Sequence, residues 1–341
     1  MRHPLPNLYI CRSPLQLLNC IEACEKLGQN GGANILICAW RAEIDRRMMQ
    51  HALELYPHWS EIHFFSLYPT KNQIPILLDV FRKRRHFANL FIGDTTHLIN
   101  IFINKVGNFE SIYLVDDGTA TISLAKRIAT HSIHRIRKNN TPRGRLSTVL
   151  QARLGLSPMF MYQAKFFTFY QIGHLGLADR IVPNDFKFIK SRIQDKPRSE
   201  EIWFIGSNIR EIILKNNLDY DDFLAQVNQR VDLSKVVYIP HRKEHDSYLS
   251  DISKRFKMEI RRMDSILEIE LTRTANLPRS IISFGSSALD TLDILAKSPV
   301  TVFCIPEKSI KTTSKSAYRD MYDSMKDKGF KMIELNDPTP I

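Results

Sequence analysis

Three short polar motifs each follow an apolar run, and together they carry groups suited to transfer chemistry on an anionic, phosphate-bearing donor. Asp116-Asp117-Gly118 supplies carboxylates, His241 supplies an imidazole, and Gly285-Ser286-Ser287 supplies hydroxyls just before a predicted helix. Each motif would lie at the carboxyl end of a strand, which is where open parallel α/β sheets bind ligands. A carboxylate held there can accept a proton, and the other groups can bind a phosphate.

The carboxylate pair Asp116 and Asp117 allows three interpretations. One carboxylate could act as a general base on a sugar hydroxyl, or the pair could cap a helix and form the turn that Asp-Gly favours. A metal-binding pair is the third, although no further acidic or His cluster lies near it in the sequence. Adjacent residues on an extended strand point to opposite faces. We predict that Asp116 is the base and that Asp117 holds the turn or the acceptor.

The second half of the chain offers phosphate-binding positions, each with a plainer alternative. His241 follows Pro240 and precedes a charged run, so it either contacts a phosphate leaving group or belongs to a solvated loop. Ser286 and Ser287 either cap a helix or bind phosphate, because both roles use the same free N–H groups. Further candidates for a donor site are Pro240 beside His241, Gly206 and Ser207 after another strand, Gly285 in the serine turn, and Ser13 at a helix start.

Strand-length apolar runs alternate with segments of helical spacing along the whole chain. This alternation predicts an α/β fold, in which a parallel sheet is wound with helices. The predicted strands are residues 8–11, 34–39, 62–67, 89–92, 111–115, 202–205, 236–239, 258–260, 280–284 and 300–305. The predicted helices are residues 14–27, 43–55, 74–87, 220–231, 247–256, 287–296 and 316–328.

The length of 341 residues accommodates two domains with separate cores. Residues 187–200 are polar and charged and contain Pro197, so they are the best linker candidate. We expect two Rossmann-like domains facing each other across a cleft. Residues 1–190 would form the first domain, with the base and the acceptor side. Residues 198–330 would bind the donor, and residues 331–341 would be a tail.

The net charge of +12 indicates an acidic partner, such as a nucleotide, an acidic sugar, nucleic acid or an anionic membrane surface. Residues 126–145 concentrate Lys and Arg beside Pro142 and Gly144. We expect a mobile cationic flap or a lipid-facing patch there, with a solvated basic loop as the default. Aromatic residues are sparse in this stretch, so a platform for single-stranded nucleic acid is poorly supported and no nucleic-acid partner is expected.

Several features bear on the cellular location. The five cysteines form no CxxC pair, and most of them lie in apolar runs and resemble small buried hydrophobic residues, a pattern that favours a reducing compartment. Arg12, Gln16 and Asn19 interrupt the first apolar stretch, which therefore does not resemble a signal peptide. The sequence contains no run of about 18 uninterrupted apolar residues, so we expect no membrane-spanning helix. We expect a cytoplasmic protein that could contact an anionic membrane peripherally.

Taken together, the motifs resemble those of the bacterial sialyltransferases of GT-B fold, including the lipooligosaccharide sialyltransferases (glycosyltransferase family 52) and the capsule polysialyltransferases. Those families carry an acidic-acidic-Gly motif, a later His-Pro motif and a Ser/Thr-rich pair. Asp116-Asp117-Gly118, His241 and Ser286-Ser287 resemble these motifs, and Cys11-Arg12-Ser13-Pro14-Leu15-Gln16 is similar to the opening strand and turn. The resemblance extends from about residue 7 to about residue 310. One departure is Arg242, which stands where the family usually has Pro.

The resemblance implies inverting transfer of sialic acid, or of a related nonulosonic acid, from its CMP-activated form to a hydroxyl of a bacterial surface glycan. Asp116 or Asp117 would take the acceptor's proton, and His241 with the serine turn would stabilise the departing CMP. Glu268 would lie near the nucleotide ribose, with Glu270 as a competing alignment. No metal and no cofactor are expected. The alternatives are a GT-B glycosyltransferase that uses another nucleotide sugar and, less favoured, a nucleic-acid-binding protein without enzymatic activity.

Overall fold

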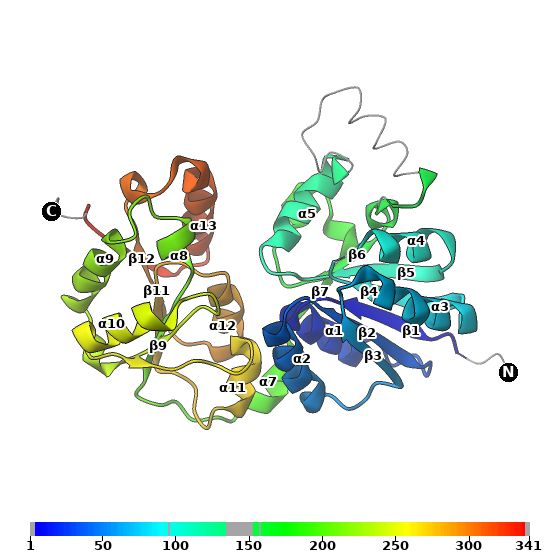
Figure 1. The fold of residues 1–341 in the computed structure, drawn as a ribbon, viewed down its shortest axis with the longest axis horizontal. Coiled ribbons are helices and arrows are strands. Elements are labelled where there is room, and N and C mark those ends of the chain that lie inside the picture. Colours follow the sequence, from blue (N-terminus) through cyan, green and yellow to red (C-terminus); the bar gives the residue numbers. More distant parts are fainter. Residues whose placement is uncertain (1–3, 95, 134–152, 157, 338–341) are drawn as a thin grey trace. The chain divides into compact units, whose positions relative to one another are not determined.

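The computed structural model describes residues 4–94, 96–133, 153–156 and 158–337. The chain divides into two compact units, Met1–Ser191 and Arg192–Ile341. Each unit is a parallel sheet whose strands are connected by helices (Figure 1). Residues 134–145 of the predicted cationic flap lie outside the described residues.

The first unit contains a seven-stranded sheet in the order β3-β2-β1-β4-β5-β6-β7. Its strands are β1 (Asn7–Cys11), β2 (Asn34–Trp40), β3 (Glu61–Ser66), β4 (His86–Ile92), β5 (Asn108–Val115), β6 (Lys165–Thr168) and β7 (Ile181–Pro183). Its helices are α1 (Pro14–Leu27), α2 (Glu43–Leu55), α3 (Gln73–Lys83), α4 (His97–Lys105), α5 (Ala120–Ala129) and α7 (Lys187–Ile193), the last of which crosses the boundary between the units.

The central strands of the first sheet are apolar on both faces, as expected for a parallel sheet covered on both sides. Tyr9, Phe91 and Tyr113 are in register on β1, β4 and β5. Their rings stack with centroids 4.6 and 4.8 Å apart. Leu8 and Ile10 point to the other face and join the core with buried residues of α3, α4 and α5. This packing holds the carboxyl ends of β1, β4 and β5 at one edge.

The second unit contains a six-stranded parallel sheet in the order β10-β9-β8-β11-β12-β13. Its strands are β8 (Ile202–Ile205), β9 (Val236–Ile239), β10 (Glu259–Ile260), β11 (Ser280–Ser283), β12 (Val300–Cys304) and β13 (Lys331–Glu334). Its helices are α8 (Ile209–Ile212), α9 (Asp219–Asn228), α10 (Asp246–Phe256), α11 (Leu267–Arg273), α12 (Ala288–Ala296) and α13 (Lys315–Asp327). Phe204, Tyr238 and Phe284 form the aromatic centre of its core.

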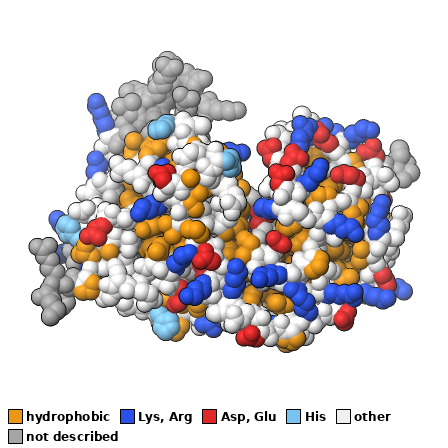
Figure 2. All heavy atoms as spheres, turned by 180° about the vertical axis from the view of Figure 1, so that it is seen from behind, with side chains coloured by type: hydrophobic (Ala, Val, Ile, Leu, Met, Phe, Trp, Pro, Cys, Tyr) orange, Lys and Arg blue, Asp and Glu red, His pale blue; other side chains and the backbone are white. Residues whose placement is uncertain are grey.

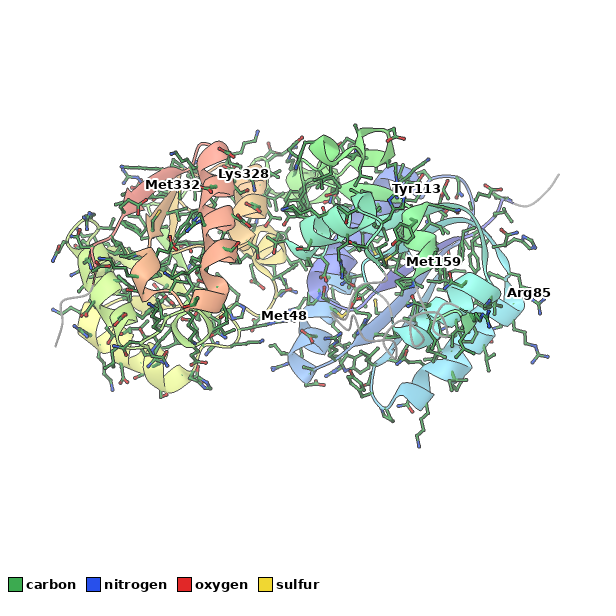
Figure 3. All side chains as sticks on the ribbon, turned by 90° about the horizontal axis from the view of Figure 1, so that it is seen from above. Met48, Arg85, Tyr113, Met159, Lys328 and Met332 are labelled. Atoms are coloured by element: carbon green, nitrogen blue, oxygen red, sulfur yellow. The ribbon has the colours of Figure 1, made fainter. Side chains whose placement is uncertain are left out.

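The boundary between the two units falls within the predicted linker, but the structure differs from two expectations about the ends of the domains. The predicted tail contains β13, which pairs with β12 through Met332↔Val302 and its neighbours, and Met332 lies in the second unit (Figure 3). The predicted linker begins as helix α7. Its Phe188 and Ile189 are buried, and their N–H groups both donate to the carboxylate of Glu22 at 2.9 Å. Charged residues flank these apolar ones in the sequence, so the pattern did not reveal a helix with one apolar face.

The positions of the cysteines and of the charged side chains agree with what the composition predicts. All five cysteines are buried and unpaired, which confirms that they act as small hydrophobic residues. Among the described residues, no helix combines the length and the apolar character needed to cross a bilayer. On the face drawn in Figure 2, Lys and Arg side chains lie among Asp and Glu side chains over both units.

Candidate functional site

The carboxyl edge of the first sheet gathers polar groups from β1, β4 and β5. Arg12 follows β1, Asp94 follows β4 and Asp117 follows β5. The Arg12 guanidinium is buried and donates from Nη1 to Asp94 Oδ2 at 2.7 Å. Arg41, after β2, approaches the same carboxylate at 3.9 Å. Four adjacent strands therefore deliver ionisable groups to one edge.

Asp117 is a partly exposed carboxylate of this edge, as is Asp94, which is bonded to Arg12. Ser13 caps α1 by accepting the Gln16 N–H at 3.2 Å, and its hydroxyl donates to Asp117 Oδ1 at 3.4 Å. Burial raises the pKa of Asp117, whereas hydrogen bonds from Gln16 and Ser13 oppose that rise. Ser13, predicted to bind the donor, thus lies beside Asp117 in the first unit. A carboxylate with a raised pKa and partial access suits a general base.

Asp116 occupies a different environment, because its side chain is fully buried. Its Oδ2 accepts the N–H of Phe169, after β6, at 3.0 Å, and its main-chain carbonyl accepts from Asn19 of α1 at 3.0 Å. Burial raises the pKa of Asp116 to about 7. The carboxylate that we predicted to be the base is therefore enclosed, where it joins β5 to β6 and α1, whereas its neighbour Asp117 is partly exposed.

In the second unit, three neighbouring strands deliver the other predicted residues. β8 lies between β9 and β11, so Gly206 and Ser207 follow the middle strand, His241 follows one neighbour and Ser286 follows the other. Adjacent strands are about 4.8 Å apart, which places the ends of β9 and β11 about 10 Å from each other. These residues, separated by up to 80 positions in the sequence, therefore share one edge of the sheet.

His241 is held in a defined orientation at the end of β9. Its Nδ1 accepts the main-chain N–H of Lys243 at 3.2 Å. In a neutral ring the proton therefore resides on Nε2. Burial, and then the positive charges of Arg242 and Lys243, lower the pKa of His241 below its usual value. At neutral pH this residue is a neutral imidazole that offers an Nε2–H donor.

The serine turn leads directly into helix α12. Gly285 is buried with a φ of 128°, a conformation that requires glycine. Ser286 accepts the N–H of Ala288 at 3.3 Å, while Ser287 is exposed at the N-cap without a capping bond from its side chain. The predicted capping role is therefore performed by Ser286. Ser286 also accepts the Leu289 N–H through its carbonyl at 3.1 Å, so the exposed Ser287 hydroxyl is the group of this turn that suits an anion.

The turn after β8 contains polar atoms without a protein partner. Ser207 Oγ and Asn208 Oδ1 are both buried and make no hydrogen bond within the described part of the chain. Buried polar atoms are almost always satisfied by protein, water or ligand. Their position between the His241 loop and the serine turn is consistent with a ligand that spans this edge.

Glu268 lies at the start of α11, where its side chain is buried and accepts the hydroxyl of Thr291 on α12. Burial raises the pKa of Glu268. The contact brings Glu268 beside the first turns of α12 and therefore close to the serine turn. Glu270, the competing residue, is also buried and approaches Arg273 at 3.8 Å. Glu268 is thus the one joined to the helix that carries the serine turn.

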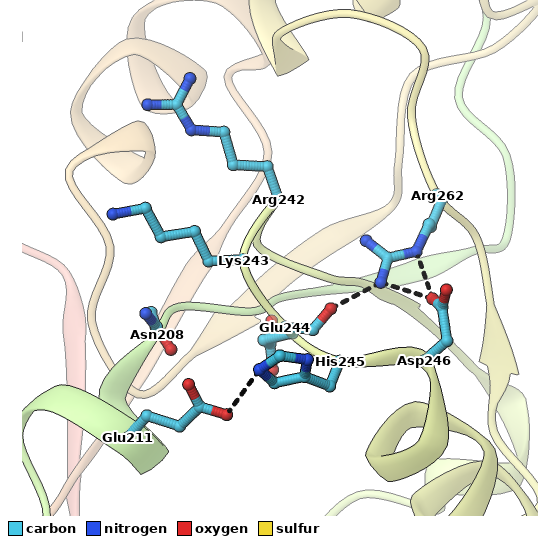
Figure 4. Close-up of a pocket in the computed structure, with 8 residues that line it drawn as sticks. All are labelled: Asn208, Glu211, Arg242, Lys243, Glu244, His245, Asp246 and Arg262. Carbon is cyan, nitrogen blue, oxygen red and sulfur yellow. Dashed lines mark hydrogen bonds and ion pairs between the residues drawn. The ribbon is translucent and has the colours of Figure 1, made fainter. Parts of the chain in front are cut away.

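An open hollow of about 640 Å³ adjoins the His241 loop (Figure 4). It is lined by Asn208, Glu211, Arg242, Lys243, Glu244, His245, Asp246 and Arg262. Arg262 donates to the Glu244 carbonyl and to Asp246, each at 2.6 Å. In Figure 4, Arg242 and Lys243 extend to one side of the loop and Arg262 lies on the other.

Sequence reasoning missed two of these residues. Glu244 follows His241 by three positions and is buried beneath its loop, and Arg12 contacts Asp94 although 82 positions separate them. A Glu within a run of charged residues gives no sign that it is buried. Arg12 was assigned only to the opening turn, because its partner is distant in the sequence.

In the described part of the chain, one group of His, Asp and Glu residues is close enough to share a cation, namely Glu61, His63 and Asp79. Glu61 begins β3, so this group starts at the opposite end of that strand from the polar edge described above. Its carboxylates already pair with Arg84 and Lys83 at 2.7 and 2.8 Å.

No protein-family model matches the sequence, and no curated protein sequence matches it. Similar solved structures exist at low identity. Glycyrrhiza uralensis UGT73P12 complexed with glycyrrhetinic acid 3-O-monoglucuronide is 8% identical, with a TM-score of 0.50 over 98% of this chain and 82% of that one. A UDP-GlcNAc 2-epimerase from Neisseria meningitidis bound to UDP-GlcNAc is 12% identical, with a TM-score of 0.50 over 95% and 91%. These similarities, with the two parallel sheets, confirm the GT-B type of fold, and at this identity they show the fold alone.

Proposed function

We propose that this protein is an inverting glycosyltransferase that moves sialic acid, or a related nonulosonic acid, from its CMP-activated donor to a hydroxyl of a bacterial surface glycan in lipooligosaccharide or capsule. The observation that carries the proposal is the edge formed by β8, β9 and β11. Three adjacent strands are followed there by a neutral His241, by the start of α12, and by the Ser207 and Asn208 oxygens, which have no hydrogen-bond partner among the described residues. The choice of a CMP-activated donor rests on the resemblance of Asp116-Asp117-Gly118, His241 and Ser286-Ser287 to the sialyltransferase motifs.

The proposed reaction exchanges one bond at the anomeric carbon for another and transfers one proton. The acceptor oxygen attacks the anomeric carbon of the donor sugar, and the bond from that carbon to the phosphate oxygen breaks with its electron pair going to CMP. The acceptor's proton passes to a carboxylate. Attack on the face opposite the leaving group inverts the anomeric centre.

Asp117 is the carboxylate we assign to this proton transfer. It is partly exposed, whereas Asp116 is fully buried and bonded to the Phe169 N–H. Burial raises the pKa of Asp117, which makes it a stronger base than an exposed Asp. Ser13 and Gln16 orient the carboxylate through hydrogen bonds.

The departing CMP gains negative charge on its phosphate. His241 would donate from Nε2, while the Ser287 hydroxyl would bind another phosphate oxygen. Glu268 would accept from a ribose hydroxyl, provided that the nucleotide reaches the start of α11. We expect neither metal nor cofactor in the reaction.

A donor panel tests the proposal without knowledge of the acceptor. Purified protein is incubated with CMP-, UDP- and GDP-activated sugars, and donor hydrolysis is followed by mass spectrometry. We expect turnover of CMP-nonulosonic acids alone. Turnover of only a UDP- or GDP-sugar would identify a GT-B glycosyltransferase with another donor. No turnover, together with salt-dependent binding of DNA or RNA, would reject an enzymatic role.

A further inference from the structure

We infer that Glu244 is a positioning residue for His241: from beneath the loop it fixes the main chain that carries the imidazole and so aims its Nε2–H at the donor phosphate. This inference deepens the proposed function and rests on it for the identity of the ligand. Nothing in the family pattern described above includes a role for this carboxylate.

The Glu244 carboxylate is buried and uses both of its oxygens. Oε1 accepts the hydroxyl of Tyr238 at 2.7 Å, and Oε2 accepts the main-chain N–H of His241 at 2.6 Å. Tyr238 in turn lies 2.9 Å from the hydroxyl of Tyr220, on α9. Tyr238 and Tyr220 are fully buried, so the carboxylate is anchored to the hydrophobic core of the unit.

The main chain of Glu244 also holds the His241 loop. The Glu244 N–H donates to the His241 carbonyl at 2.9 Å. The Lys243 N–H donates to His241 Nδ1 at 3.2 Å. His241 is therefore held at its N–H, at its carbonyl and at one ring nitrogen, and within the described part of the chain its Nε2 is left to face a ligand.

Arg242 and Gly206 explain why the His241 loop needs the Glu244 carboxylate and how the carboxylate fits there. Position 242 is Arg, which leaves φ free where a proline would restrict it, so the loop needs another restraint. Gly206 makes room for that restraint, because a Cβ at this position would lie 2.6 Å from Glu244 Oε2 and 2.9 Å from the Tyr238 hydroxyl. The carboxylate fits between β8 and β9 only because β8 is followed by glycine.

The test is a double-mutant cycle on CMP binding and turnover, using Glu244→Ala, His241→Ala and the double variant. If Glu244 acts through His241, either single change weakens CMP binding by about 10- to 100-fold, as the loss of a hydrogen bond to a charged group predicts. The double variant then binds no more weakly than His241→Ala alone. Additive losses would overturn the inference and leave Glu244 a merely structural residue.

Two conservative variants refine the test. Glu244→Gln retains an oxygen for the His241 N–H, and the Tyr238 hydroxyl can reverse from donor to acceptor, so CMP affinity should stay within about threefold. The shorter side chain of Glu244→Asp cannot reach both the Tyr238 hydroxyl and the His241 N–H, so this variant should weaken CMP binding as much as Glu244→Ala does. It replaces Glu244→Ala in the test if the alanine variant does not fold. Equal losses in Gln and Asp would contradict the positioning role. Glu259→Gln, an exposed carboxylate on β10, is the control.

Hydrogen exchange separates failure of this inference from failure of the proposed function. If the wild-type protein does not bind CMP, the proposed donor is wrong. The loop can still be judged, because Glu244→Ala should raise the exchange rate of the amides of residues 241 and 243 at least tenfold, whereas Glu259→Gln should not. Unchanged protection at those amides would reject the positioning role whatever the ligand is.

Discussion

Asp116 and Asp117 are neighbours in the sequence, yet they occupy chemically different places. One is fully buried between β5 and β6, and the other is partly exposed beside Ser13. We expect Asp117→Asn to lower the transfer rate by about 10²- to 10⁴-fold with CMP affinity unchanged, because a general base is lost. Asp116→Asn should keep the rate within about tenfold. Steady-state kinetics and calorimetry of CMP measure both, and an inactive but folded Asp116 variant with a normal Asp117 variant would restore the roles we first predicted.

His241 contributes a hydrogen bond in the proposed site, not a positive charge, because burial and two adjacent cations lower its pKa. Its contribution should therefore be independent of pH between about 7 and 9, where the ring stays neutral. We expect His241→Ala to weaken CMP binding at every pH in that range by the same factor. Calorimetry at three pH values checks this. A loss that grows as the pH falls through 7 would mean that the charged imidazolium does the binding.

At the scale of the elements, the turn after β8 determines how closely the His241 loop approaches the sheet. We expect Gly206→Ala to push the Glu244 carboxylate away and to lower the unfolding free energy by about 1–3 kcal/mol, the usual effect of overpacking. CMP affinity should fall as well. Gly173→Ala is the matched control, because a Cβ there would meet its nearest neighbour at an ordinary 3.7 Å. Chemical denaturation and calorimetry measure the two effects, and equal stability of both variants would refute the packing argument.

At the scale of the whole molecule, three buried carboxylates make stability depend on pH in an unusual direction. Burial raises the pKa values of Asp116, Glu22 and Glu244 to about 7. Unfolded carboxyl groups titrate near pH 4. Between these limits the folded protein binds more protons than the unfolded chain, so stability falls as the pH rises from about 4 to about 7.

Asp116→Asn tests this dependence with one substitution. The unfolding free energy of the wild-type protein should fall between pH 5.5 and pH 7.5, partly because Asp116 loses its proton. Without this carboxyl group the fall should be smaller by about 2 kcal/mol. Denaturant titrations at the two pH values give the difference directly. Glu200→Gln, an exposed carboxylate, should leave the dependence as it is. An equal slope in Asp116→Asn and the wild-type protein would show that the buried Asp116 is ionised throughout.

Local signals in the sequence were sufficient for most elements. The periodicity and the Ser-Pro start predict a helix over residues 14–27, and α1 has those bounds. The apolar run 236–239 coincides with β9. The predicted helix 74–87 was too long, because Arg84 is extended and β4 begins at His86, where it pairs with Asn108 of β5. That partner lies 22 residues away, so no local pattern reveals it.

The sequence by itself determined the α/β alternation, the buried strands and the residue types at their carboxyl ends, because these depend on hydrophobic period and turn chemistry within a few residues. Only the tertiary structure decided which ends meet. The strand order places β8 between β9 and β11, buries Asp116 while leaving Asp117 accessible, and puts the Glu244 carboxylate under His241. Burial and hydrogen bonding depend on neighbours from distant parts of the chain, so the chemistry of a carboxylate is decided by packing.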